Sequence, residues 1–133
     1  MVQRQYSVVL IKDKIKGDAF AAPSSQIFRG HTAPLNCLAY DEQKQVLYTA
    51  GGDGLIRSWN LMSGEAMKIL RGHEGPIFCL LIHKRMLYSG SSDKSARSWV
   101  LEFGECTRVY SGHRHTVSSI RHFDGMCKHY TYF

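Results

Sequence analysis

The stretches LYTAGGDGLIRSW, residues 47–59, and LYSGSSDKSARSW, residues 87–99, are two versions of one pattern placed forty positions apart. Each begins with Leu-Tyr and a hydroxyl residue, continues through a Gly- or Ser-rich turn, and places a tryptophan six positions after an aspartate. Short apolar runs broken by such turns are typical of antiparallel hairpins. The chain therefore repeats one β-hairpin unit.

The repeat extends well beyond these hairpins. The tripeptides RGH, RGH and SGH end at His31, His73 and His113, so the unit recurs after 42 and then 40 residues. Apolar residues follow each histidine at the fourth and seventh positions, and a small residue follows at the sixth. The two-residue difference in length falls in a polar connection, where loops tolerate it. Self-similarity at this period predicts a repeat architecture.

Each unit divides into four apolar-rich segments separated by turn signals. The pattern predicts strands over 34–40, 46–50, 55–61 and 66–70 in the first unit, and over 76–82, 86–90, 95–101 and 106–110 in the second. A further strand is predicted over 115–123. The fold class is therefore all-β.

The units resemble WD40 repeats, in which each repeat supplies the strands of a four-stranded propeller blade. The resemblance covers residues 24–122 and depends on the Gly-His pair, the strand hydroxyl, the turn aspartate and the tryptophan at matching offsets. It implies a partial WD40 β-propeller arc of antiparallel four-stranded blades, two complete and two partial. The usual Trp-Asp dipeptide is replaced by Trp59-Asn60 and Trp99-Val100.

The resemblance also implies a buried hydrogen-bonded tetrad in each complete unit. Indole is a donor only, a hydroxyl donates and accepts, imidazole bridges a donor and an acceptor, and a carboxylate accepts. A chain of bonds from tryptophan through hydroxyl and histidine to aspartate therefore satisfies every member. The two expected tetrads are His31, Thr49, Asp53, Trp59 and His73, Ser89, Asp93, Trp99.

Both ends depart from the repeat. Residues 1–23 match no unit, although YSVVLI at 6–11 has the composition of an edge strand, and QIFRGH at 26–31 resembles the outer strand of a preceding blade. The segment 123–133 diverges, yet Tyr130 and Thr131 follow His113 at the spacing of Tyr48 and Thr49 after His31. Open blade faces lack apolar neighbours. We therefore expect a truncated form of a longer propeller, or an arc that an oligomer or a partner chain completes.

For function, the resemblance implies a non-catalytic protein-protein interaction scaffold or adaptor, with an unidentified protein or peptide partner. An alternative is a regulatory or non-functional short form whose arc another chain completes. Loops at one rim of a propeller are the expected binding surface. The candidate partner-binding residues are Thr32, Gly51, Gly52, Glu74, Ser91, Ser92, Lys94 and Arg114.

A hydrolase using Ser89, His73 and Asp93 is a more distant alternative, because these are the residue types of a catalytic triad. No Gly-x-Ser-x-Gly elbow is present, and the first unit repeats the same set with Thr49. The sequence therefore predicts a protein that is not an enzyme, with no small-molecule substrate and no cofactor.

Composition excludes several other classes. The formal charge of +6 is spread along the chain, which does not favour a nucleic-acid site, and the longest apolar run near the start is too short for a membrane span. The cysteines are interpreted as free thiols of an intracellular protein, cytoplasmic or nuclear. A late cluster of possible ligands fits no zinc spacing, so no metal site is predicted: Cys106, His113, His115, His122, Cys127 and His129.

Overall fold

A computed structural model of the chain describes residues 6–12, 24–123 and 126–131, with side chains described for 27–123. The described residues form strands and turns, and none of them belongs to a helix long and apolar enough to cross a membrane. The strands are β1 (Tyr6–Lys12), β2 (Ser24–His31), β3 (Leu35–Asp41), β4 (Val46–Gly51), β5 (Ile56–Asn60), β6 (Ala66–Leu70), β7 (Ile77–His83), β8 (Met86–Ser91), β9 (Ala96–Val100), β10 (Glu105–Tyr110), β11 (Val117–Phe123) and β12 (Met126–Thr131).

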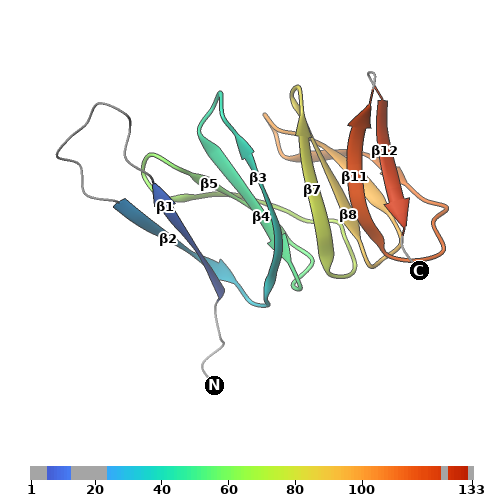
Figure 1. Ribbon diagram of the computed structural model, residues 1–133, viewed down its shortest axis with the longest axis horizontal. Coiled ribbons are helices and arrows are strands. Elements are labelled where there is room, and N and C mark those ends of the chain that lie inside the picture. The colour runs from blue at the N-terminus through green and yellow to red at the C-terminus, as the bar shows by residue number, and fades with distance from the viewer. Residues whose placement is uncertain (1–5, 13–23, 124–125, 132–133) are drawn as a thin grey trace.

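Two of the sheets are complete antiparallel meanders of four strands. One has the order β3-β4-β5-β6 and the other has the order β7-β8-β9-β10, so successive strands are neighbours throughout. The two sheets stand side by side in chain order (Figure 1). The prediction of an all-β chain built from four-stranded blades is confirmed.

A two-stranded sheet flanks this pair on each side, β1-β2 at one end of the row and β11-β12 at the other (Figure 1). They are the two partial blades that the sequence predicts. β1 lies in the segment 1–23 that matches no repeat, and it pairs with β2 from Lys12↔Ser24 to Tyr6↔His31. The rest of that segment lies outside the described residues.

The register of β12 differs from what the spacing after His113 suggests. His129 pairs with Ile120, just as Thr49 pairs with Leu38 in the first complete sheet. The matching spacing of Thr131 therefore does not place it at the position of Thr49, because the connection before β12 is two residues shorter than the one before β4. The third unit follows the spacing of the second.

The hydrophobic cores lie between successive sheets. The largest cluster joins Ile56 and Leu70 of the first complete sheet to Ile77, Leu87 and Trp99 of the second. A second cluster packs β2 against the first complete sheet, and a third packs the second complete sheet against β11. Each sheet therefore buries its apolar side chains mainly against the neighbouring sheets, as expected for stacked repeats.

Candidate functional site

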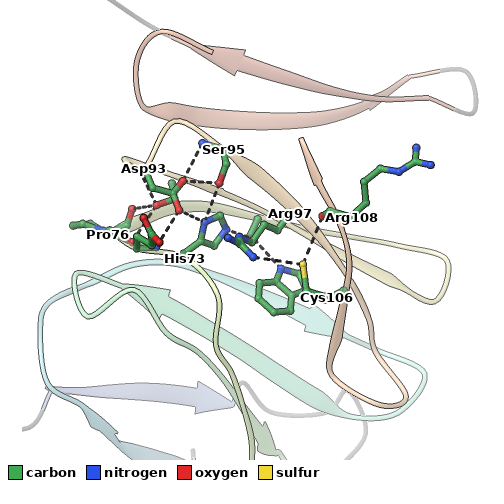
Figure 2. Close-up of polar contacts among 12 residues, drawn as sticks. His73, Pro76, Asp93, Ser95, Arg97, Cys106 and Arg108 are labelled. Atoms are coloured by element: carbon green, nitrogen blue, oxygen red, sulfur yellow. Dashed lines mark hydrogen bonds and ion pairs between the residues drawn. The ribbon is translucent and has the colours of Figure 1, made fainter. Parts of the chain in front are cut away.

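The second complete sheet holds a continuous chain of side-chain hydrogen bonds (Figure 2). The indole Nε1–H of Trp99 donates to the Ser89 Oγ at 2.9 Å, and this Oγ lies 2.6 Å from the His73 Nε2. The His73 Nδ1 lies 2.8 Å from the Asp93 Oδ2. A neutral imidazole protonated on Nδ1 gives every member a partner of the right kind, because Ser89 then donates to Nε2 and Nδ1–H donates to the carboxylate.

The first complete sheet repeats this geometry with a threonine in place of the serine. The Trp59 Nε1–H donates to the Thr49 Oγ1 at 2.8 Å, which lies 2.7 Å from the His31 Nε2. The His31 Nδ1 lies 2.8 Å from the Asp53 Oδ2. The structure thus brings together all eight residues of the two expected tetrads, four in each network.

The order of the strands makes each network a bridge between sheets. His73 follows β6, the outer strand of one sheet, whereas Ser89 lies on β8 and Trp99 on β9 of the next. His31 likewise ends β2, and its partners belong to the sheet that follows. Each histidine therefore fastens the exit of one sheet to the interior of its neighbour, at a position where water is excluded.

Backbone groups orient the two aspartates. Asp53 accepts hydrogen bonds from the N–H groups of Thr32 and Leu55, at 3.2 and 3.1 Å. Burial alone would raise the pKa of this carboxyl, but these bonds and His31 together hold it below its ordinary value. The carboxylate is therefore ionised and fully engaged.

Asp93 is held still more firmly. It accepts from the N–H groups of Glu74 and Ser95, at 3.1 and 2.9 Å, and from the Ser95 hydroxyl at 2.6 Å. Burial opposes ionisation, but Ser95, His73 and the backbone bonds outweigh it and lower the pKa of Asp93 to about 2. Sequence reasoning missed Ser95, because the first unit has Leu55 at that position and the repeat gives no signal there.

Burial is the main influence on the two histidines. It lowers the pKa of His31 and of His73 below the ordinary value of 6.5, although the neighbouring aspartates oppose this shift. Neutral imidazole is also the form that the hydrogen-bond pattern requires. Electrostatics and geometry therefore agree on one protonation state.

The order of Ser89, His73 and Asp93 resembles that of a hydrolytic triad, but the Ser89 hydroxyl is buried and already hydrogen bonded. A nucleophilic oxygen must reach a substrate, with donors nearby for the developing oxyanion. The Ser89 side chain has 0% exposure, and its Oγ already accepts the indole N–H of Trp99. The arrangement is suited to holding the sheets together.

The glycine before each network histidine allows a close approach. A Cβ placed on Gly72 would lie 2.8 Å from an Arg97 guanidinium nitrogen and 3.0 Å from the Trp99 ring. Gly30 has the same relation to Arg57 and Trp59. The two arginines therefore pack against these glycines within the blades.

The expected partner-binding residues divide by exposure. Thr32, Glu74, Lys94 and Arg114 are exposed, and Gly52 and Ser92 are half-buried. Gly51 and Ser91 are buried, and the Ser91 hydroxyl lies 3.0 and 2.9 Å from the carbonyl oxygens of Gly75 and Pro76. Gly51 and Ser91 therefore present little surface to a partner, and the Ser91 hydroxyl is already used within its own unit.

An open cleft of about 680 Å³ lies at the opposite ends of the inner strands, between the two complete sheets. Carboxylates of Asp41, Glu42 and Glu102 and cations of Lys84 and Arg85 share its lining. The lining carries charges of both signs and has no buried polar groups that converge on one point. It therefore does not indicate which ligand could bind. Lys84 and Arg85 are both exposed to solvent.

The late His and Cys residues do not assemble into a metal site in the part of the chain that is described. No group of three or more His, Cys, Asp or Glu side chains there has the geometry to hold a metal ion. The rings of His83 and His122 stack with centroids 3.6 Å apart, which does not direct their nitrogens to a common ion. The side chains of Cys127 and His129 lie outside the described set.

Four-stranded antiparallel sheets stacked side by side, with a recurring polar network between them, define the blades of a β-propeller. Comparison with known families agrees with this class. The model of the WD domain, G-beta repeat, matches residues 23–60 and 64–99, more than half of the sequence. The chain belongs to the WD40 repeat family, whose members generally serve as protein-interaction scaffolds.

Individual relatives match over short segments. A bromodomain and WD repeat-containing protein of Dictyostelium discoideum is 39% identical over 54 residues, which is 41% of this chain and 2% of the relative. F-box/WD repeat-containing protein 10 of Mus musculus is 35% identical over 57 residues, 43% of this chain and 6% of the relative. Mitochondrial division protein 1 of Mycosarcoma maydis is 40% identical over 52 residues, 39% of this chain and 6% of the relative. The chain thus spans a small part of each relative.

Proposed function

We propose that this chain is a non-catalytic scaffold or adaptor that binds a protein or peptide at the rim carrying the Gly-His loops. The proposal rests on the difference between two sets of side chains in those loops, one hydrogen bonded internally and the other exposed to solvent. Their reactive groups, the two histidines and two aspartates, are committed to internal hydrogen bonds. The side chains that face solvent on the same loops include Thr32, Glu74, Lys94 and Arg114.

The rigidity of these loops supports the binding role. The N–H groups of Thr32 and Glu74 donate to the partly buried carboxylates of Asp53 and Asp93, so both loops are fixed by the networks beneath them. Preorganised loops on a rigid scaffold lose little entropy when a partner binds. The networks therefore serve binding indirectly, by positioning exposed neighbours.

A charge-matched pair of variants tests the rim. Lys94→Glu with Arg114→Glu alters the Gly-His rim, while Lys84→Glu with Arg85→Glu changes the same amount of charge at the opposite rim. Affinity capture followed by mass spectrometry is expected to yield proteins bound by the wild type and by the opposite-rim control, and lost with the Gly-His rim variant. Proteins retained equally by both variants, or lost only with the control, would contradict this site.

The hydrolase alternative has a test of its own. An active-site fluorophosphonate label is expected to leave Ser89 unmodified, because its oxygen is buried and hydrogen bonded on both sides. Labelling of Ser89 that a Ser89→Ala change abolishes would instead favour the hydrolase.

We also propose an intracellular setting, cytoplasmic or nuclear, in keeping with the F-box/WD relatives. Cell fractionation with an antibody to this chain tests it, and recovery from the medium would contradict it.

A further inference from the structure

Lys94 has a backbone conformation that lysine rarely adopts. Its φ is 69°, in the left-handed region that favours glycine. The equivalent residue of the first complete sheet is Gly54, with a φ of 72°. Each of the two residues donates its N–H to the carbonyl oxygen three positions earlier, which belongs to Ser91 or Gly51, so the two turns have the same geometry. The second unit therefore has a strained lysine at a position where glycine would fit without strain.

The turn that holds Gly54 lies against the Gly-His loop of the next unit, because a Cβ on Gly54 would be 3.2 Å from the Gly75 carbonyl oxygen. His115 is the equivalent of Gly75 in the third unit, since each follows the histidine of its Gly-His pair by two positions. β11 also packs against the second complete sheet as β7 packs against the first. The repeat therefore places Lys94 beside the third Gly-His loop. Arg114 is the residue before His115 on that loop, and it is exposed, as Lys94 is.

The two cations at this joint are not neutralised by an ion pair. Within the described residues, no ion pair joins Lys94 or Arg114 to a carboxylate. Asp93, the residue before Lys94, carries one negative charge, but its carboxylate points inward to His73 and Ser95 (Figure 2). The two exposed cations outnumber it. The joint therefore presents positive charge to the solvent.

The equivalent joint between the first and second units has the opposite character. Gly54 occupies the position of Lys94 there, and Glu74 occupies the position of Arg114. Glu74 is exposed. The Gly-His rim is therefore electrostatically asymmetric, negative at the first joint and positive at the second. Neighbouring patches of opposite sign select a ligand by its charge and fix where along the rim it binds.

We propose that Lys94 and Arg114 form a subsite for a short run of aspartate or glutamate side chains in the protein partner. This subsite rests on the proposed scaffold function and adds the chemistry of the partner at that rim. The role accounts for the strained backbone of Lys94, which holds a cation where the first unit has glycine. Two cations bounded by Glu74 match a short acidic stretch, whereas the longer phosphate backbone of a nucleic acid would also meet Glu74.

Binding of an acidic peptide to the full chain tests the subsite. The probe is a fluorescein-labelled oligoglutamate peptide, and an oligoglutamine peptide of the same length with the same label is its control. Fluorescence anisotropy is expected to show binding of oligoglutamate alone, and added salt is expected to weaken it because exposed charges are screened. Equal binding of oligoglutamine, or tighter binding of a single-stranded oligonucleotide than of oligoglutamate, would overturn the proposal.

Charge-matched variants locate the site, because the chain has a formal charge of +6 and could attract an acidic peptide elsewhere. Lys94→Glu with Arg114→Glu is expected to reduce the affinity for oligoglutamate by about tenfold or more. Lys84→Glu with Arg85→Glu makes the same change of net charge at the opposite rim, and it is expected to leave the affinity within about twofold of the wild type. Equal losses from both variants would mean that net charge alone attracts the peptide, and would overturn the proposal.

Lys94→Gly separates binding from folding. It gives the second turn the residue of the first and relieves the backbone strain, so the Tm is expected to be unchanged or higher. The affinity for oligoglutamate is expected to fall by roughly twofold to fivefold, as for the loss of one exposed ion pair. Wild-type affinity in this variant, or a Tm that falls together with the affinity, would overturn the binding role of Lys94.

The affinity-capture experiment distinguishes this subsite from the scaffold function on which it rests. If the captured proteins depend on Lys94 and Arg114 but oligoglutamate does not bind, the acidic subsite is wrong and the rim function stands. If capture does not depend on that rim, both are wrong.

Discussion

Replacement of Ser89 by alanine tests the polar network at its central atom. The Ser89 Oγ lies 2.9 Å from the Trp99 indole nitrogen and 2.6 Å from the His73 Nε2, so its removal leaves both groups without this partner. Trp99 and Ser89 are at most 1% exposed, and water has no direct access to the space between them. A small cavity is the only other change.

The magnitude follows from the two orphaned groups. A buried polar group that loses its partner costs about 1 to 3 kcal/mol, so with two such groups Ser89→Ala is expected to lower the free energy of unfolding by about 2 to 6 kcal/mol. This is a large share of the roughly 5 to 15 kcal/mol that stabilises a typical domain. The loss is of the size that usually marks disruption of a buried network.

Urea denaturation followed by tryptophan fluorescence measures this difference. Ser89→Thr is the matched control, because Thr49 occupies the equivalent position at 0% exposure and keeps the hydroxyl. We expect Ser89→Thr to change the free energy of unfolding by less than about 1 kcal/mol. An alanine variant within about 0.5 kcal/mol of the wild type, or a threonine variant as unstable as the alanine one, would refute the reasoning.

Three further predictions follow from burial. Below pH 6.5 the unfolded chain binds protons at His31 and His73, whereas burial lowers the pKa of both histidines in the folded chain. The Tm measured by circular dichroism is therefore expected to fall as the pH is lowered from 7 to 5. A constant or rising Tm would contradict this. Partial burial raises the pKa of the Cys37 thiol to about 12, so Ellman's reagent at pH 8 should modify exposed Cys106 at least several-fold faster than Cys37. Equal rates would argue against this half-buried position. A Cβ on Gly90 would lie 2.7 Å from the Val117 Cγ1 of the next sheet. Gly90→Ala should therefore lower the free energy of unfolding by about 1 to 3 kcal/mol, and an unchanged free energy would contradict that packing.

The repeat made the blades and their networks predictable. Residue types with fixed hydrogen-bonding capacities recur at fixed offsets in both units. This recurrence predicts the members of one network, which are Trp99, Ser89, His73 and Asp93. Strand boundaries also follow, because apolar runs and turn residues alternate in both units. These are local signals, and two copies of each reinforce them.

Features outside the repeat were less accessible to sequence reasoning. The strand pairing of β1 with β2 carries no Gly-His or tryptophan signal and depends on contacts across a long separation in the chain. The register of His129 depends on the length of one connection, which differs between units. The burial of Ser91 escaped notice because a hydroxyl in a turn is compatible with both a surface and an internal bond.

The Gly-His rim was predicted as a surface, but its chemistry depends on three-dimensional detail. Thr32 and Glu74 appear in the sequence as loop residues of ordinary character. Only the structure shows that their backbone N–H groups are anchored on Asp53 and Asp93 while their side chains are exposed. The same argument applies to Ser95, because the bond from its hydroxyl to Asp93 has no counterpart at Leu55 of the first unit.

The most direct test of the central claim is hydrogen exchange at the two indole N–H groups. The chain has two tryptophans, so a ¹⁵N-labelled sample gives two indole signals, from Trp59 and Trp99. Buried hydrogen bonds to Thr49 and Ser89 predict that both signals persist for hours in D₂O, since exchange then requires the sheets to open. Loss of either signal within the first minutes, under conditions where the strand amides remain protected, would contradict the networks that hold the blades together.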